Sequence, residues 1–334
     1  MAKYSIILPV RNGGHLLKQC VSSILSQTFT DFDFIVLDNC SNDGTLEWLS
    51  SITDKRIEVF SSNKSLTIEE NWSRVKDIEK NEFMTLIGHD DILYPDFLQT
   101  IERLVLQQPS ASLYHTHYNF IDAGSKTTRA CKPMKPVYNG SQFLAALIAG
   151  SIDSMGTGYV MRSKDYDAIG GIQAKYPNLL FADFELWVSL AVKSFVAIDP
   201  HNCFAFRVHQ STTQTSGDHK LHKALHLFVD YLASIKEQDK SMHDVIQQYG
   251  ACFLLHYCKA YVHRLLRLPL PARNNIRVND LINETKVMAD QLGVSSSYHP
   301  EKKSSLQLAK RIDDNNFLRF LFLQFKKLYP KPIG

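Results

Sequence analysis

Short apolar runs alternate with apolar residues at helical spacing along the first third of the chain. Buried strands are predicted where the runs occur, at 4–9, 32–37, 57–60 and 83–87. Other segments repeat apolar residues every three or four positions, which predicts helices over 16–25, 45–51, 68–78 and 97–106. Strands that alternate with helices predict an α/β fold, in which helices cover both faces of a mostly parallel sheet.

The pattern changes twice further along the chain. From 108 to about 215 it is less regular, which predicts a mixed sheet edge and connecting loops. After that the chain has a helical pattern, with a packing seam formed by Leu221, Leu225, Phe228, Leu232 and Ile235. We therefore expect a first domain over 1–215 and a helical C-terminal region over 216–334, which serves oligomerisation, acceptor binding or membrane contact.

The composition is that of a folded protein without a large charge imbalance. The 334 residues are 44% hydrophobic and 21% charged, with a formal net charge of +3. Such a small charge argues against nucleic acid as the partner. The six cysteines include no CxxC pair, and the start of the chain lacks a signal-peptide pattern. A cytoplasmic protein with reduced thiols is the simplest expectation.

Basic and apolar residues gather at the C-terminal end. The strongly apolar segment 317–328 would form a helix of about 18 Å, which is too short to cross a bilayer. It fits either a helix at the membrane surface or a terminal helix docked on the rest of the protein or on another subunit. From residue 302 onward, Asp313 and Asp314 are outnumbered by basic residues: Lys302, Lys303, Lys310, Arg311, Arg319, Lys326, Lys327 and Lys331.

Polar segments follow three of the predicted strands, at 9–12, 38–44 and 88–91. In a parallel sheet the carboxyl ends of the strands meet at one edge, where ligands bind. Asp90 and Asp91 are adjacent carboxylates that repel each other unless a cation or a hydrogen-bond donor offsets them, and Mg²⁺ or Mn²⁺ prefers such oxygen ligands. The alternative is a loop whose acids cap the helix that begins near Asp96.

The segment after the second strand offers a different kind of contact. Asp38 can accept hydrogen bonds from a base or a ribose, whereas Ser41 and Asp43 fit an ordinary turn and helix cap. The first loop, 9–14, contains neither GxGxxG nor GxxxxGK[ST], which disfavours a dinucleotide fold and a P-loop ATPase.

A set of motifs in a fixed order resembles the family 2 glycosyltransferases of the GT-A fold. It covers about residues 3–215 and consists of Ser5-Ile-Ile-Leu-Pro-Val-Arg-Asn12, Ser23-Ile-Leu-Ser-Gln-Thr28, Ile35-Val-Leu-Asp-Asn-Cys-Ser-Asn-Asp-Gly-Thr45, Asn71, Leu86-Ile-Gly-His-Asp-Asp-Ile-Leu93, Ile169-Gly-Gly171, Ala182-Asp-Phe-Glu-Leu-Trp187 and Phe206-Arg-Val-His209. The resemblance implies an enzyme that takes a sugar from a nucleoside-diphosphate donor, most often a UDP-sugar. It also implies an acceptor that is a glycan or a lipid-linked glycan, and a setting in bacterial surface polysaccharide synthesis. A lipid-linked acceptor would give the apolar C-terminal segment a purpose at the inner face of the plasma membrane.

The resemblance also assigns roles to residues. Asp90 and His209 would bind the divalent metal, Mn²⁺ or Mg²⁺, and Asp183 would be the general base. The donor would be held by Pro9, Val10, Asn12, Asp38, Asn71, Asp91 and Arg207.

Two positions depart from the family pattern. The family often has Asp-x-Asp-Asp where this chain has Gly88, so one contact to ribose or metal is missing. Its Glu-Asp pair is here Ala182-Asp183, and Glu185 is a candidate for the absent acidic neighbour.

Taken together, the motifs predict transfer with inversion, in which Asp183 accepts the proton of the attacking hydroxyl. A divalent ion and Arg207 would stabilise the leaving diphosphate. Two alternatives stay open. One is a non-catalytic sugar-nucleotide-binding protein, suggested by the acids missing at Gly88 and Ala182. The other is a nucleotidyltransferase, although the chain lacks the Gly-rich, basic first loop expected there.

Overall fold

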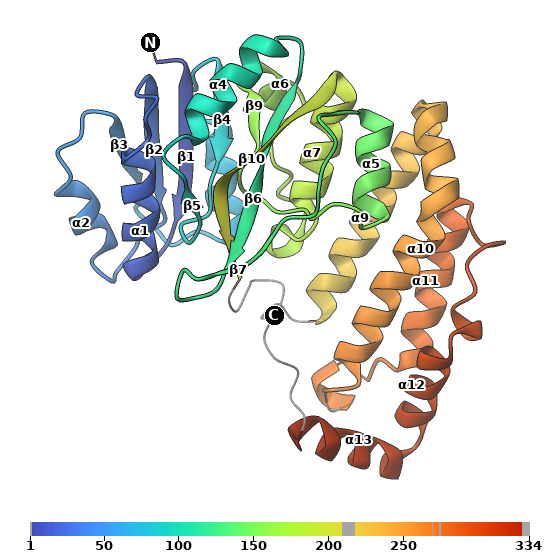
Figure 1. Ribbon diagram of the computed structural model, residues 1–334. Coiled ribbons are helices and arrows are strands. Elements are labelled where there is room, and N and C mark those ends of the chain that lie inside the picture. The colour runs from blue at the N-terminus through green and yellow to red at the C-terminus, as the bar shows by residue number, and fades with distance from the viewer. Residues whose placement is uncertain (1, 209–217, 269, 274, 329–334) are drawn as a thin grey trace. The chain divides into compact units, whose positions relative to one another are not determined.

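A computed structural model describes residues 2–208, 218–268, 270–273 and 275–328 of the chain (Figure 1). The chain divides into two compact units. Unit 1 consists of Met1–Phe143 and Gly150–His209, and unit 2 consists of Leu144–Ala149 and Gln210–Gly334. The functions expected of the helical region stay predictions.

Unit 1 is built on a ten-stranded sheet whose strands run β3-β2-β1-β4-β9-β6-β10-β5, with β7 beside β6 and β8 beside β10. The first four of these strands pair in parallel. They and the helices that connect them agree closely with the pattern of the sequence: β1 Tyr4–Val10, α1 Gly14–Leu25, β2 Phe32–Asp38, α2 Thr45–Ser50, β3 Ile57–Ser61, α3 Ile68–Ser73 with a 3₁₀ turn at Arg74–Lys76, and β4 Phe83–Leu86.

The other half of the sheet is mixed, as the irregular pattern after residue 108 indicates. β6 and β10 are parallel, whereas β9, β5, β7 and β8 each pair antiparallel with their neighbours. The α/β prediction is therefore confirmed. The elements are β5 Ile92–Leu93, α4 Phe97–Gln107, β6 Leu113–Ile121, β7 Thr127–Ala130, β8 Val137–Asn139, α5 Gly140–Ile148, β9 Val160–Arg162, α6 Ser163–Ala168, a 3₁₀ turn Pro177–Leu179, α7 Ala182–Lys193 and β10 Phe195–Arg207.

The central strands place three polar segments at one edge of the sheet. All seven residues of β1 are buried, as expected for a strand covered on both faces. In the parallel register Val10 pairs with Asp38, and Ile7 pairs with Leu86. The segments that follow β1, β2 and β4 therefore leave the sheet on the same side, where ligands of such sheets bind.

Unit 2 is helical in its described part. On α9 the predicted seam is largely confirmed, because Leu221, Leu225, Phe228 and Leu232 are all buried. No helix of the described residues is long and apolar enough to span a membrane. The helices are α9 Asp218–Gln238, α10 Lys240–Leu265, α11 Val278–Leu292, α12 Ser304–Asp314 and α13 Asn316–Leu328, with 3₁₀ turns at Leu270–Arg273 and Pro300–Lys302.

Candidate active site

The loops after β1 and β2 are joined by hydrogen bonds. Asn12, in a left-handed conformation with φ of 53°, donates its N–H to Oγ of Ser41 at 2.9 Å. Its side-chain oxygen accepts the N–H of Asn42, also at 2.9 Å. The carboxylate of Asp43 accepts the N–H of Gly14, and these bonds give Ser41 and Asp43 the structural roles expected of them. Asn12 is thereby fixed at the sheet edge, where only the exposed Arg11 separates it from the buried Pro9 and Val10.

Asp38 is the last residue of β2, and only one of its two carboxylate oxygens accepts hydrogen bonds from described residues. Oδ2 accepts hydrogen bonds from the N–H of Ser41 at 3.3 Å and from the hydroxyl of Ser61 at 3.0 Å. Oδ1 is buried and has no hydrogen-bond partner among the described residues. A buried acceptor without a donor is costly, so its presence marks a position where a ligand N–H or O–H fits.

Asn71 and Arg74 hold the end of β2 in place. The amide of Asn71 donates to the carbonyl of Leu37 at 3.2 Å and accepts from Arg74 at 2.9 Å. Arg74 also donates to the carbonyl of Asp38, at 2.9 Å. The structure thus gives Asn71 a positioning role, and its contact with a donor stays a prediction.

The carboxylates of Asp90 and Asp91 converge over Gly88. A Cβ atom at Gly88 would lie 2.8 Å from Oδ1 of Asp90 and 3.1 Å from Oδ2 of Asp91. A side chain at position 88 would therefore displace the two carboxylates. Glycine avoids this clash because it has no Cβ atom. Asp91 is buried and Asp90 is half-exposed. Burial, together with the charge of Asp90, raises the pKa of Asp91 well above the usual range of a carboxylic acid.

Arg207, the last residue of β10, donates hydrogen bonds to both Asp90 and Asp91. β5 pairs antiparallel with β10, and the N–H of Arg207 donates to Oδ1 of Asp91 at 2.9 Å. Its buried guanidinium donates to the carbonyl of Asp90 at 2.7 Å. It donates further to the carbonyls of Asp122 and Ala123, the hydroxyl of Ser125 and Oε1 of Gln19. These contacts give Arg207 a positioning role, and its contact with the diphosphate stays a prediction.

The end of α1 fixes the segment that follows the acid pair. Ser23 accepts the N–H of Leu93 at 3.1 Å, and Gln27 donates to the carbonyl of Tyr94 at 2.7 Å. The N–H of Thr28 donates to the carbonyl of Pro95 at 2.8 Å. The motif at 23–28 therefore holds the segment 93–95, directly after the acid pair.

Asp183 lies in the first turn of α7, after a run of unusual backbone. It accepts the N–H of Phe184 at 3.0 Å, and burial raises its pKa to about 6. The φ angles just before it are positive at three residues, none of them glycine: Asn178 at 54°, Leu179 at 57° and Phe181 at 69°. Such residues cost roughly 1–3 kcal/mol each and cluster at functional sites. A carboxyl group with a pKa near neutrality suits a general base.

The segment 155–159 touches both acidic parts of the site. Thr157 accepts the N–H of Gly88 at 3.1 Å and also hydrogen-bonds Asp91. Tyr159 is buried close to Asp183, whose charge adds to the burial that raises the pKa of the phenol. Nothing in the sequence around Thr157 signals this role, because a lone threonine in a loop has no distinctive pattern.

Two other side chains on α7 have structural partners. Trp187 is buried, donates to the carbonyl of Met155 at 3.0 Å and stacks on Tyr159. Glu185 is bonded to the hydroxyl of Tyr176 and to Lys175. Its carboxylate is therefore held by Tyr176 and Lys175, and its role as a substitute for the acid absent at Ala182 stays a prediction.

Residues 5–164 match the family described as glycosyl transferase family 2. An uncharacterized glycosyltransferase of Rickettsia conorii is 27% identical over 191 residues, which are 56% of this chain and 31% of that protein. The UDP-Glc:alpha-D-GlcNAc-diphosphoundecaprenol beta-1,3-glucosyltransferase WfgD of Escherichia coli is 24% identical over 135 residues, which are 40% of this chain and 53% of WfgD.

Among solved structures, S. aureus TarS 1–349 in complex with UDP-GlcNAc resembles the chain with a TM-score of 0.60 at 11% identity. The superposition covers 92% of this chain and 90% of that one. The chain contains a family 2 glycosyltransferase domain. Its GT-A fold, predicted from the motif order, is thereby confirmed. The chain spans between about a third and about half of the length of the two relatives given above.

The glycosyltransferase domain brings most of the predicted site residues to one side of the sheet. Pro9, Val10, Asn12 and Asp38 end neighbouring parallel strands, and Asp90 and Asp91 follow the next strand. His209, predicted as a metal ligand, lies outside the described residues. Gln19, Arg74 and Thr157 are structural supports that the sequence did not reveal.

Proposed function

We propose that this protein transfers a sugar from a UDP-sugar to a glycan or lipid-linked glycan, with inversion at the anomeric carbon. The observation that carries the proposal is the convergence of Asp90 and Asp91 over Gly88, because two adjacent carboxylates at this edge of the sheet, one of them buried, favour a cation beside them. The name of WfgD includes a diphosphoundecaprenol-linked GlcNAc, which supports a lipid-linked glycan as the acceptor, and we propose a setting in bacterial surface polysaccharide synthesis.

The donor preference rests on Asp38. Its unsatisfied Oδ1 can accept one hydrogen bond, and the N3–H of uracil would supply it. The loop at Pro9–Asn12 lies beside it and is held rigidly by Ser41 and Asn42. The names of the relatives point the same way, since WfgD uses UDP-Glc and the TarS complex contains UDP-GlcNAc.

The residues present fit a divalent ion, Mn²⁺ or Mg²⁺. Asp90 is the half-exposed member of the pair and would be the ligand, while Asp91 is held by the N–H of Arg207 and by Thr157. A bound ion would neutralise the diphosphate charge that develops as the donor bond breaks. Asp91 then serves mainly to fix Asp90, with Arg207 as its support.

Asp183 carries the proton transfer. The acceptor hydroxyl gives its proton to the carboxylate while its oxygen bonds to the anomeric carbon. On the opposite face the bond to the nucleoside diphosphate breaks, and that group leaves with the electron pair. A pKa of about 6 leaves Asp183 ionised near neutral pH and still basic enough to accept a proton.

We further propose that α13 rests on an anionic membrane surface on the cytoplasmic side. Arg319 is buried and bonded to the carbonyl of Leu268, and Phe322 is half-buried on the same side of the helix. The opposite side exposes Phe317, Leu318, Phe320, Leu321, Phe325 and Leu328. The basic residues in and before this helix complement anionic lipid, and a lipid-linked acceptor would give the contact a purpose. The other reading, a helix docked on another subunit, predicts a homo-oligomer.

The test is release of the nucleoside diphosphate from a panel of UDP-, GDP- and dTDP-sugars, with candidate glycan acceptors and with Mn²⁺, Mg²⁺ or EDTA. We expect turnover of one donor, abolished by EDTA and by Asp90→Ala, and unchanged in the matched control Asp31→Ala on an exposed loop. Donor binding without turnover under every condition would instead support the non-catalytic sugar-nucleotide-binding protein.

A further inference from the structure

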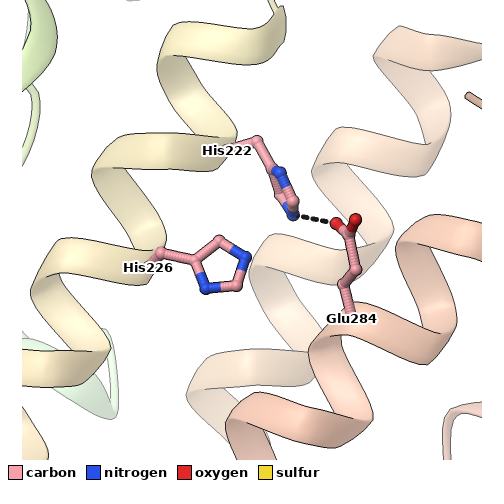
Figure 2. Close-up of side chains that lie close together, drawn as sticks. All are labelled: His222, His226 and Glu284. Atoms are coloured by element: carbon pink, nitrogen blue, oxygen red, sulfur yellow. Dashed lines mark ion pairs between the residues drawn. The ribbon is translucent and has the colours of Figure 1, made fainter.

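Three potential metal ligands come together in unit 2, on helices that the proposed reaction does not use. His222 and His226 are four residues apart on α9 and therefore lie on one face of that helix. Glu284 projects toward them from α11, as Figure 2 shows. One ligand atom from each of the three side chains lies within 4.8 Å of the others.

The three side chains already lie near the spacing that a bound metal ion requires. Nε2 of His222 is 2.6 Å from Oε2 of Glu284, and the rings of His222 and His226 lie 4.7 Å apart, almost perpendicular at 81°. A tetrahedral ion with bonds of about 2.0–2.2 Å holds its ligand atoms about 3.3 Å apart. The His222–Glu284 pair would open by a fraction of an ångström and His226 would turn inward, which are side-chain rotations only.

The helices beneath the cluster are well anchored. Leu225 and Phe228 on α9 are fully buried, as are Thr285 and Met288 on α11. The side chain of His222 is 19% exposed and that of Glu284 is 43% exposed, so an ion can enter from solvent while remaining partly shielded. An i, i+4 histidine pair on a fixed helix, faced by a carboxylate on a second fixed helix, is a preorganised arrangement.

We propose that His222, His226 and Glu284 bind a first-row transition-metal ion, with Zn²⁺ as the best match. Two imidazoles and one carboxylate suit zinc, whereas Mg²⁺ and Ca²⁺ prefer oxygen ligands throughout. Water would complete the coordination. The bound ion would link α9 to α11 and stabilise the helical unit, separately from the hard-ion site at Asp90.

The competing explanation is an interhelical ion pair between His222 and Glu284 alone. His226 separates the two ideas, because it is no part of that ion pair yet is needed as the third ligand. Removing His226 leaves that ion pair intact. Glu284→Gln is a second variant that keeps the shape of the side chain and removes its charge.

The experiment uses the full chain without a histidine tag, stripped with EDTA and titrated with ZnCl₂ by calorimetry. In parallel, CoCl₂ is added and its visible absorption is recorded as a report of coordination. We expect a zinc site with imidazole-type cobalt bands in wild type and in Asp90→Ala. That site should bind at least tenfold more weakly in His226→Ala and in Glu284→Gln. The matched control His243→Ala, at an exposed histidine of α10, should bind like wild type.

Zinc should also raise the unfolding temperature of wild type and of His243→Ala, but not that of His226→Ala. The proposal is overturned if wild type binds no zinc. It is equally overturned if His226→Ala and Glu284→Gln bind zinc as tightly as wild type does. Circular dichroism of each variant before titration ensures that a lost site reflects a lost ligand.

Discussion

The main-chain N–H of Arg207 donates a 2.9 Å hydrogen bond to Oδ1 of Asp91, across 116 positions of sequence. This bond ties the end of β10 to the acidic turn that follows β4. The guanidinium of the same residue holds the carbonyl of Asp90 at 2.7 Å. Arg207 thus holds both Asp90 and Asp91 in place. The orientation of the two carboxylates toward a ligand therefore depends on this one residue.

The Arg207→Lys variant tests this positioning role. Lysine keeps the charge but cannot donate to Asp90, Gln19 and the carbonyl of Asp122 at once. We expect the Mn²⁺ concentration for half-maximal UDP release to rise, and kcat/KM to fall about 10- to 100-fold. Arg129→Lys, at a surface ion pair with Asp153, is the matched control. An unchanged metal dependence with a lower kcat would instead indicate direct contact with the diphosphate.

Asp38→Asn should weaken nucleotide binding. The substitution replaces an unsatisfied carboxylate oxygen by a neutral amide, which loses a charge-assisted hydrogen bond worth about 1.5–3 kcal/mol. Calorimetry should show an affinity for UDP roughly 10- to 100-fold lower. Asp33→Asn, at an exposed position on the same strand, should bind UDP like wild type. Equal UDP affinities in the two variants would remove Asp38 from the donor site.

The sequence predicts the central strands well because their signal is local. β1, β2 and β4 are buried on both faces, so each is a continuous apolar run followed by polar residues. The two-residue strand β5 is different. It exists only because Ile92 and Leu93 pair with β10, far along the chain, and no short window of sequence contains that information.

The site shows the same division. The sequence singles out Asp38, Asp90 and Asp183 as candidates because acids in particular motifs follow particular elements, and their roles stay predictions. What their neighbours do was not recognisable, since it depends on contacts that only the folded chain makes. Arg207 was expected to face the diphosphate, yet its donors are engaged by protein acceptors that include Gln19. Glu185 was a candidate for a missing acid, yet Tyr176 and Lys175 hold it.

Activity should depend on pH through Asp183. Its pKa of about 6 means that the general base is protonated, and inactive, below that pH. We expect kcat/KM to be level above about pH 7 and to fall tenfold per pH unit below about pH 5.5. Asp183→Asn should lower kcat by about 10²- to 10⁴-fold and lose this limb of the profile, while UDP affinity is retained. Asp77→Asn, at an exposed acid, is the control. Full activity in Asp183→Asn would remove Asp183 as the base.

The same substitution should stabilise the protein. The folded pKa of Asp183 lies above its model value of 3.8, so the ionised carboxylate costs folding free energy. That cost is complete above about pH 6 and disappears as the pH falls to about 4. After allowance for the partial exposure of the side chain, Asp183→Asn should gain roughly 1–2 kcal/mol at pH 8. Urea unfolding at pH 8 and pH 4 measures it. A gain that is equal at both pH values would contradict the argument.

Helix α13 should bind anionic membranes through its exposed apolar side. The double substitution Leu321→Glu and Phe325→Glu places charges on that side without touching Arg319, which faces inward. We expect wild type to sediment with vesicles containing phosphatidylglycerol, less so at high salt, and not with phosphatidylcholine alone. The variant should bind at least about 100-fold more weakly, because each of the two large apolar side chains is worth about 1.5–3 kcal/mol when buried.

Val192→Glu is the control for the vesicle experiment, since Val192 is a similarly exposed apolar residue on α7, with 48% of its surface accessible. It should sediment with vesicles like wild type. Analytical ultracentrifugation without lipid addresses the competing interpretation. If wild type forms an oligomer that Leu321→Glu with Phe325→Glu dissociates, and neither protein binds vesicles, then α13 covers a second copy of the chain instead of a membrane. The exposed side would then explain self-association, and the basic residues around it would need a different role.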